Sequence, residues 1–126
     1  MSAPRKPVIM VVDDSRSILE TAQNFLGDSY EVIQVKNGFS ALAAVQDRTP
    51  DLIFLDVVMP ELDGYSTCLA IKDNPRFSDL PIIILSSKDS PFDKAHGEQM
   101  GCDDYLTKPF SEEDLKAKVR QHLRLA

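Results

Sequence analysis

The strongest constraint on the fold of this chain is an unbroken run of four apolar residues, 52–55, that ends in a carboxylate, Asp56. Residues that favour turns bound the run, with Pro50 before it and the dipeptide Asp63-Gly64 after it. A continuous apolar run of this length predicts a strand that is buried on both faces, as in a parallel sheet. Asp56 is then expected at the carboxyl edge of the sheet, which is where open α/β sheets bind ligands.

Two further apolar runs also end in polar side chains. Residues 8–12 precede Asp13 and Asp14, and residues 81–85 precede Ser86. The remaining predicted elements are two weaker strands, 30–35 and 105–106, and five helices, which begin after Ser15, Asn37, Asp63, Pro91 and Ser111. Five strands that alternate with five helices, without a repeat or a linker, predict one α/β domain built on a doubly wound, five-stranded parallel sheet.

Composition argues against several classes of function. The 126 residues suit one domain, and 14 Lys and Arg against 20 Asp and Glu give a net charge of −6, which disfavours nucleic-acid and anionic-membrane partners. The two cysteines, Cys68 and Cys102, lack metal-site spacing and are expected to be small core or near-surface thiols. No apolar segment has the length of a membrane span, and residues 1–7 lack the apolar core of a signal peptide. We therefore expect a cytoplasmic protein without membrane insertion.

The predicted sheet gathers polar side chains from distant parts of the sequence into one crevice, because its central strands end at the same edge. These side chains are Asp13, Asp14, Asp56, Ser86 and Lys108. Three carboxylates packed together repel one another, so they favour a hard divalent cation with oxygen ligands, and Mg²⁺ is the expected ion. A carboxylate can attack a phosphoryl group when Mg²⁺, a lysine and a hydroxyl lie beside it, because Mg²⁺ and the lysine ammonium offset the charge of the phosphoryl oxygens.

Four motifs occur in order along the chain: Asp13-Asp14; Asp56 with Met59-Pro60 and Asp63-Gly64; Leu85-Ser86-Ser87; and Lys108-Pro109-Phe110. Each motif alone is common at a helix start, a turn or a strand end. The set, over about residues 7–124, resembles the CheY-like receiver domain of two-component response regulators. The resemblance implies the flavodoxin-like (βα)5 fold with strand order 2-1-3-4-5. It also implies a single receiver domain over residues 1–126, with no output domain.

The resemblance implies a role for each residue of the predicted crevice. Asp56 is the phosphoacceptor, and Lys108 and Ser86 contact the phosphoryl group. The implied Mg²⁺ ligands, which Mn²⁺ could also use, are Asp14, Asp56 and the backbone carbonyl of Val58, with Asp13 acting through water.

The same resemblance implies residues that form a conformational switch and residues that control the lifetime of the phosphorylated state. Ser86 and Tyr105 form the switch, and a cis bond precedes Pro109. Val58 and Lys88 flank the path of the hydrolytic water. Because Val58 offers no hydrogen bond that would orient this water, we expect a phosphorylated state that is longer-lived than in fast chemotaxis-type receivers.

The implied function is that of a signalling switch in a two-component or chemosensory system. A histidine kinase phosphorylates Asp56, and the domain then changes its affinity for an output protein. Segments 63–68 and 86–95 look like those of single-domain receivers in type IV pilus and twitching-motility systems, so the output protein is expected in a pilus or motility system. The chain is not expected to be an enzyme beyond catalysing its own phosphorylation and dephosphorylation with Mg²⁺.

Three other functions compete with the switch. A Mg²⁺-dependent phosphohydrolase would use the same nucleophile, but it would need a substrate pocket, and the chain has no cap insertion to build one. A receiver without its own output could act as a phosphate sink. A degenerate receiver would only bind partners, and the intact acids and Lys108 argue against that function.

Overall fold

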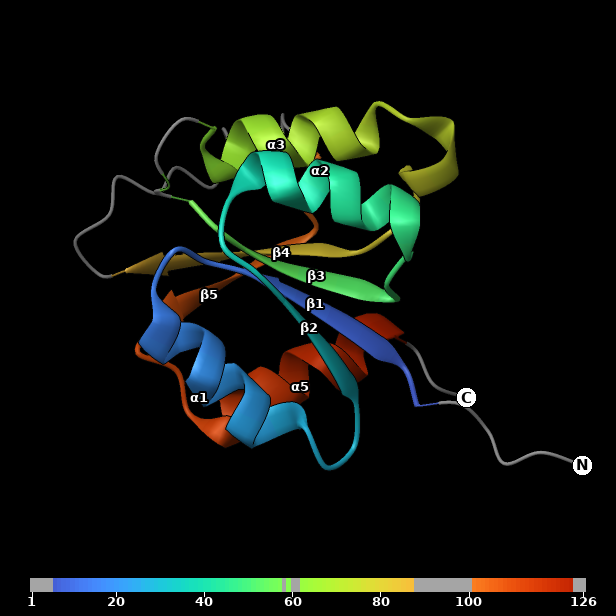
Figure 1. Cartoon of the computed structure of the whole chain (residues 1–126). Helices are drawn as coiled ribbons and strands as arrows, with labels where there is room; N and C mark the ends of the chain where they lie inside the picture. The colour runs from blue at the N-terminus through green and yellow to red at the C-terminus, as the bar shows by residue number, and fades with distance from the viewer. Residues whose placement is uncertain (1–5, 58, 60–61, 88–100, 124–126) are drawn as a thin grey trace, which may run out of the picture.

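The computed structural model describes residues 6–57, 59, 62–87 and 101–123. Its central layer is a parallel sheet with helices on both faces (Figure 1). The strands are β1 (Val8–Val12), β2 (Glu31–Val35), β3 (Leu52–Asp56), β4 (Ile82–Ser87) and β5 (Asp104–Lys108). The helices are α1 (Arg16–Leu26), α2 (Gly38–Asp47), α3 (Gly64–Lys72) and α5 (Glu112–Leu123), together with a short 3-10 helix, η1 (Pro75–Phe77).

The strand order β2-β1-β3-β4-β5, with every neighbouring pair parallel, confirms the predicted doubly wound topology. All residues of β1 and β3 are buried, because helices cover both faces of the central strands. The continuous apolar runs therefore predicted these doubly buried strands correctly. The helix predicted after Pro91 falls on residues 88–100 and lies outside the described residues.

Two elements differ from the sequence prediction. β5 begins at Asp104 and ends at Lys108, whereas only residues 105–106 were expected as a strand. Leu106 is the buried residue of this edge strand, so β5 lacks the apolar run that marks the central strands. The 3-10 helix η1 was not predicted, because its signal is local: the Asn74 side chain accepts a hydrogen bond from the backbone N–H of Arg76 at 3.0 Å.

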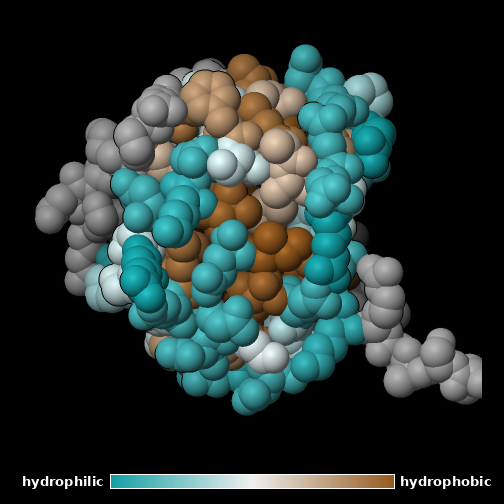
Figure 2. All heavy atoms as spheres, viewed as in Figure 1, coloured by the Kyte–Doolittle hydropathy of each residue, from teal (hydrophilic) through white to brown (hydrophobic). Residues whose placement is uncertain are grey.

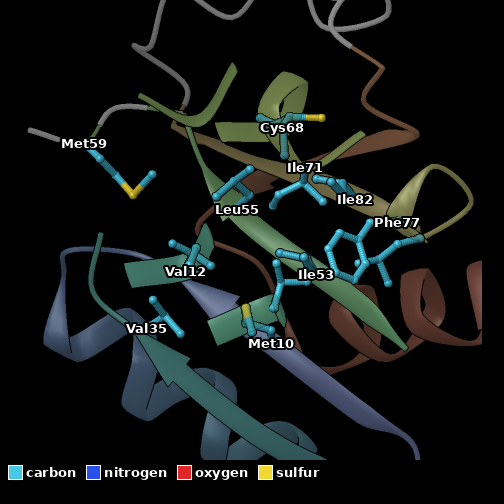
Figure 3. Packing of buried hydrophobic residues seen from close by; sticks show 14 of the residues in the cluster. Met10, Val12, Val35, Ile53, Leu55, Met59, Cys68, Ile71, Phe77 and Ile82 are labelled. Atoms are coloured by element: carbon cyan, nitrogen blue, oxygen red, sulfur yellow. The ribbon is translucent and has the colours of Figure 1, made fainter. Parts of the chain in front are cut away.

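Two apolar cores fill the spaces between the sheet and its helix layers. α2 and α3 cover one face, and the cluster beneath them includes Met10, Ile53, Cys68 and Ile71 (Figure 3). α1 and α5 cover the other face, where Phe54 belongs to a second cluster. Successive residues of β3 thus enter opposite cores, as the alternation of side chains along a strand requires. The sheet is packed on both faces, so the carboxyl ends of its strands are the expected place for a ligand.

Side-chain caps confirm the predicted helix starts. Ser15, Asn37 and Asp63 each accept a hydrogen bond from the backbone N–H three residues later, at 3.5, 2.7 and 2.8 Å. At the start of α5, Ser111 Oγ accepts from the Asp114 N–H at 3.0 Å, and Asp114 Oδ2 accepts from the Ser111 N–H at 3.3 Å. This reciprocal pair is the capping box that the sequence predicts.

The surface seen from the same side as Figure 1 is apolar at its centre, between the two helix layers, and towards the top, and it is hydrophilic at the sides and below (Figure 2). The edge strand β2 is only partly covered, and its residues Val32 and Ile33 are half-buried. Within the described ranges, no helix combines the length and the apolar character that crossing a membrane would need.

The burial of the central strands predicts a large difference between two apolar truncations. Ile83 on β4 is fully buried, whereas Phe39 on α2 is 55% exposed. We expect Ile83→Ala to lower the free energy of unfolding by about 2–5 kcal/mol, because it removes buried methyl groups and leaves a cavity. Phe39→Ala should change it by no more than about 0.5 kcal/mol. Urea unfolding followed by circular dichroism measures both, and equal losses would contradict the described packing.

Candidate functional site

Three carboxylates meet at the carboxyl edge of the sheet, where the sequence places them. Asp13 directly follows β1 and is fully buried, Asp56 ends β3 and is 6% exposed, and Asp14 is exposed. One oxygen from each lies within 4.8 Å of the other two. Asp13 Oδ1 also accepts a hydrogen bond from the Ser15 N–H at 2.9 Å, so the entry into α1 fixes this carboxylate.

Lys108 supplies the positive charge of the site from the end of β5. Its Nζ donates to Asp13 Oδ2 at 2.7 Å and to Asp56 Oδ1 at 3.3 Å. The Lys108–Pro109 peptide bond is cis, as the resemblance implies. Burial alone would lower the pKa of the Lys108 ammonium, but the hydrogen bond and charge of Asp13, with the charge of Asp56, outweigh burial and raise this pKa above its ordinary value. Lys108 therefore carries its charge at neutral pH.

The charges of the cluster suit a hard divalent cation. Three carboxylates against one ammonium leave two negative charges among these four groups at short range, and Asp13 and Asp56 are largely out of water. Carboxylate oxygens are the ligands that Mg²⁺ accepts, and the exposed Asp14 leaves room for the waters that Mg²⁺ retains. The donor set therefore fits the expected ion in both charge and ligand type.

The dipeptide Asp63-Gly64 contacts the end of β3, the strand that carries Asp56, as well as starting a helix. The Gly64 N–H donates to the Val57 carbonyl at 2.9 Å, and a Cβ at Gly64 would overlap the Asp56 carbonyl. The fully buried Thr67, one turn along α3, donates its hydroxyl to the Asp63 carbonyl at 2.8 Å. Sequence reasoning singled out the dipeptide but missed Thr67, a polar residue on the buried face of α3.

The two expected switch residues occupy neighbouring strands. Ser86, 4% exposed, lies on β4 one residue beyond Leu85, which is paired with Asp56 in the sheet register. Tyr105 lies on β5 opposite Ile84 and is 37% exposed. Ser86 is thus next to the carboxylate cluster, whereas Tyr105 lies further along the sheet at the surface. The two expected lifetime residues, Val58 and Lys88, lie outside the described residues.

A groove beside Tyr105 runs between β5 and α5. Its lining includes Tyr105, Thr107, Pro109 and Lys118. At its edge, Asp104 Oδ2 lies 2.8 Å from both Lys118 Nζ and His122 Nε2.

Asp104 on the edge strand β5 is paired with Lys118 and His122 of α5. Burial opposes ionisation of this carboxyl, but the hydrogen bonds with His122 and Lys118 outweigh burial and lower its pKa. The spacing of four residues between Lys118 and His122 puts both side chains on one face of α5. In the sequence, this spacing was the feature that could have predicted a shared partner for the two.

Comparisons with known proteins agree with this geometry. Residues 9–120 match the family described as response regulator receiver domain. Protein PilG from Pseudomonas aeruginosa is 49% identical over 116 residues, which cover 91% of this chain and 86% of PilG. The alkaline phosphatase synthesis transcriptional regulatory protein PhoP from Bacillus subtilis is 42% identical over 117 residues. The match covers 92% of this chain but 48% of PhoP, so the chain spans about half the length of this relative.

Two solved structures share the fold over nearly the whole chain. Chemotaxis protein CheY4 from Vibrio cholerae superposes with a TM-score of 0.86 at 33% identity, covering 91% of this chain and 97% of that chain. The receiver domain of NtrX from Brucella abortus superposes with a TM-score of 0.85 at 30% identity, covering 94% and 99%. With its family match, its CheY-like topology and its PilG-like sequence, this chain belongs to the response regulator receiver domain family of two-component and chemosensory systems.

Proposed function

We propose that the chain is a phosphorylation-dependent switch in which Asp56 accepts a phosphoryl group from a histidine kinase. One observation carries the proposal: Asp13, Asp14 and Asp56 converge at one sheet edge, with the Lys108 ammonium bonded to the two buried carboxylates. Asp56 is the member that ends a central strand and borders the turn at Gly64, so its carboxylate faces the ligand edge of the sheet.

The chemistry is a transfer to a carboxylate oxygen. An Asp56 oxygen attacks phosphorus, the bond from phosphorus to the donor nitrogen of phosphohistidine breaks, and that nitrogen keeps the electron pair. Lys108 already contacts Asp56 Oδ1, so its ammonium is placed to offset charge on the phosphoryl oxygens. Mg²⁺ or Mn²⁺, held by Asp14, Asp56 and the Val58 carbonyl and through water by Asp13, would supply further positive charge at the phosphoryl oxygens.

The switch couples the new phosphoryl group to β5 and α5. Ser86 is buried next to the register position of Asp56, and its hydroxyl can donate to a phosphoryl oxygen after a small rotation. Movement of Ser86 leaves space along β4 for Tyr105, which is half-exposed on the adjacent strand. The groove lined by Tyr105 and Lys118 would then change shape, and with it the affinity for an output protein.

The similarity to PilG suggests where this output acts. We propose that the output protein belongs to a pilus or motility system and that the kinase belongs to the same chemosensory pathway. The 49% identity over most of both chains supports this assignment more strongly than the longer relatives do, since the chain spans only about half of those.

Removing the nucleophile should abolish phosphorylation without unfolding the domain. We expect Asp56→Asn to incorporate no phosphate from acetyl phosphate and Mg²⁺, because an amide cannot act as the nucleophile. Intact-protein mass spectrometry measures the incorporation. The matched control is Asp47→Asn, which changes an exposed carboxylate at the end of α2 and should remain phosphorylatable. Labelling that persists in Asp56→Asn, or that is unaffected by excess chelator, would refute the assignment.

Removing the Ser86 hydroxyl should separate phosphorylation from switching. We expect Ser86→Ala to accept phosphate but to lose on the order of 1.5–3 kcal/mol of coupling, the contribution of one charge-assisted hydrogen bond. The measurement is the change in amide chemical shifts of β5 and α5 on phosphorylation, which should be much smaller than in the parent chain. If the shifts were as large as in the parent, coupling through Ser86 would be wrong.

Adding one methyl group at Gly64 should disturb the phosphoacceptor. Because the new Cβ overlaps the Asp56 carbonyl, Gly64→Ala must displace β3 or α3, and a displacement of about 1 Å at a reacting group can slow a reaction on the order of 100-fold. We expect phosphorylation by acetyl phosphate to slow by at least about tenfold at a temperature where the variant is folded. Ala70→Gly, on the exposed side of the same helix, is the control and should keep the parent rate. A parent rate in Gly64→Ala would show that this contact does not position Asp56.

A further inference from the structure

Two thiols meet in a part of the molecule that the phosphorylation chemistry does not use. Cys68 lies on α3 and Cys102 lies two residues before β5, 34 positions later in the sequence. Their sulfur atoms are 3.2 Å apart, within contact distance, and both residues are reduced thiols. The sequence predicted two small core or near-surface thiols, and the fold brings them into contact.

Polar contacts hold the segment that carries Cys102 against both α3 and β4. Asp103 pairs with Lys72 of α3 at 2.8 Å between Oδ2 and Nζ. Its backbone N–H donates to the Ile82 carbonyl at 2.9 Å, and its carboxylate accepts from the Ile82 N–H at 2.8 Å. Gly101, at φ +90°, lies so close to α3 that an added Cβ would be 3.2 Å from Lys72 Cγ. These contacts set the separation of the two sulfurs.

The two thiols differ in access and in acidity. Cys68 is fully buried in the α2–α3 core, near Ile71 (Figure 3). Cys102 packs against this core and is partly exposed. The hydrogen bond between the two thiols lowers the pKa of Cys102, against the opposing effects of burial and of the Asp103 carboxylate. The same hydrogen bond and burial raise the pKa of Cys68. Cys102 is thus placed as the attacking thiolate and Cys68 as the resolving thiol.

We propose that Cys68 and Cys102 form an oxidisable dithiol site that reacts with low-molecular-weight disulfides of the glutathione type and closes to an intramolecular disulfide. The Cys102 thiolate attacks one sulfur of the small disulfide, and the first small thiolate leaves with the electron pair. Cys68 then loses its proton and attacks the Cys102 sulfur, which releases the second small thiol. The two protein thiols are oxidised by two electrons, and the small disulfide is reduced to two thiols.

The geometry requires little movement for this reaction. A disulfide bond is about 2.05 Å long, so the sulfurs must approach each other by about 1 Å, which side-chain rotation can supply. Because Cys68 is already in contact with Cys102, the second step is intramolecular and should outrun attack by free small thiol. The product links α3 covalently to the segment that leads into β5. This proposal does not depend on the proposed phosphorylation of Asp56.

The test uses the whole chain in buffers of oxidised and reduced glutathione. After acid quenching, the protein is unfolded, alkylated with N-ethylmaleimide and weighed intact. We expect both alkylation sites to disappear together, with a mass lower by about 2 Da than the reduced chain and no glutathionyl adduct. The closed disulfide should raise the melting temperature by on the order of 5–10 °C, and dithiothreitol should reverse both changes.

Single substitutions assign the two steps. Cys68→Ser, or Cys68→Ala if the hydroxyl is not tolerated in the core, should stop as a stable mixed disulfide between Cys102 and glutathione. Cys102→Ser should leave Cys68 reduced, because the remaining thiol is buried. The parent chain is compared under conditions that fully modify Cys102 in the Cys68 variants. The proposal is overturned if the parent chain then keeps both thiols or accumulates the mixed disulfide. The pair would then be a packing contact alone.

Discussion

The site depends on the mutual repulsion of three carboxylates that the sheet forces together. Asp13 and Asp56 are buried, so water screens them poorly, and the Lys108 ammonium offsets part of their charge. Together these three carboxylates and the ammonium keep a net negative charge, which favours a divalent cation. Apolar residues on both faces of β1 and β3 hold these acids in place despite their repulsion.

Much of the fold could be predicted from the sequence because its central strands are buried on both faces. The apolar runs before Asp13, Asp56 and Ser86 predicted three strands and the edge at which their polar ends meet. β5 was underestimated, since an edge strand with one buried residue lacks that pattern. Thr67 and the contact between Cys68 and Cys102 escaped prediction for another reason: each depends on how α3 packs, which periodicity does not specify.

α3 connects several of these features. Its first residue, Gly64, contacts the backbone of Asp56 and Val57, and its buried Thr67 fixes the turn before it. Its far end holds Lys72, which pairs with Asp103 beside the dithiol. A displacement of this helix would therefore alter both β3, which ends in Asp56, and the start of β5.

The contact between Lys108 and Asp13 joins residues that are 95 positions apart in the sequence. It requires β1, β3, β4 and β5 to be paired in register, so a partly folded chain cannot assemble the site. Contacts of such long range form late and slow the folding of parallel sheets. Assembly of the carboxylate–lysine site thus coincides with completion of the fold, so a nascent or damaged chain would lack the site altogether.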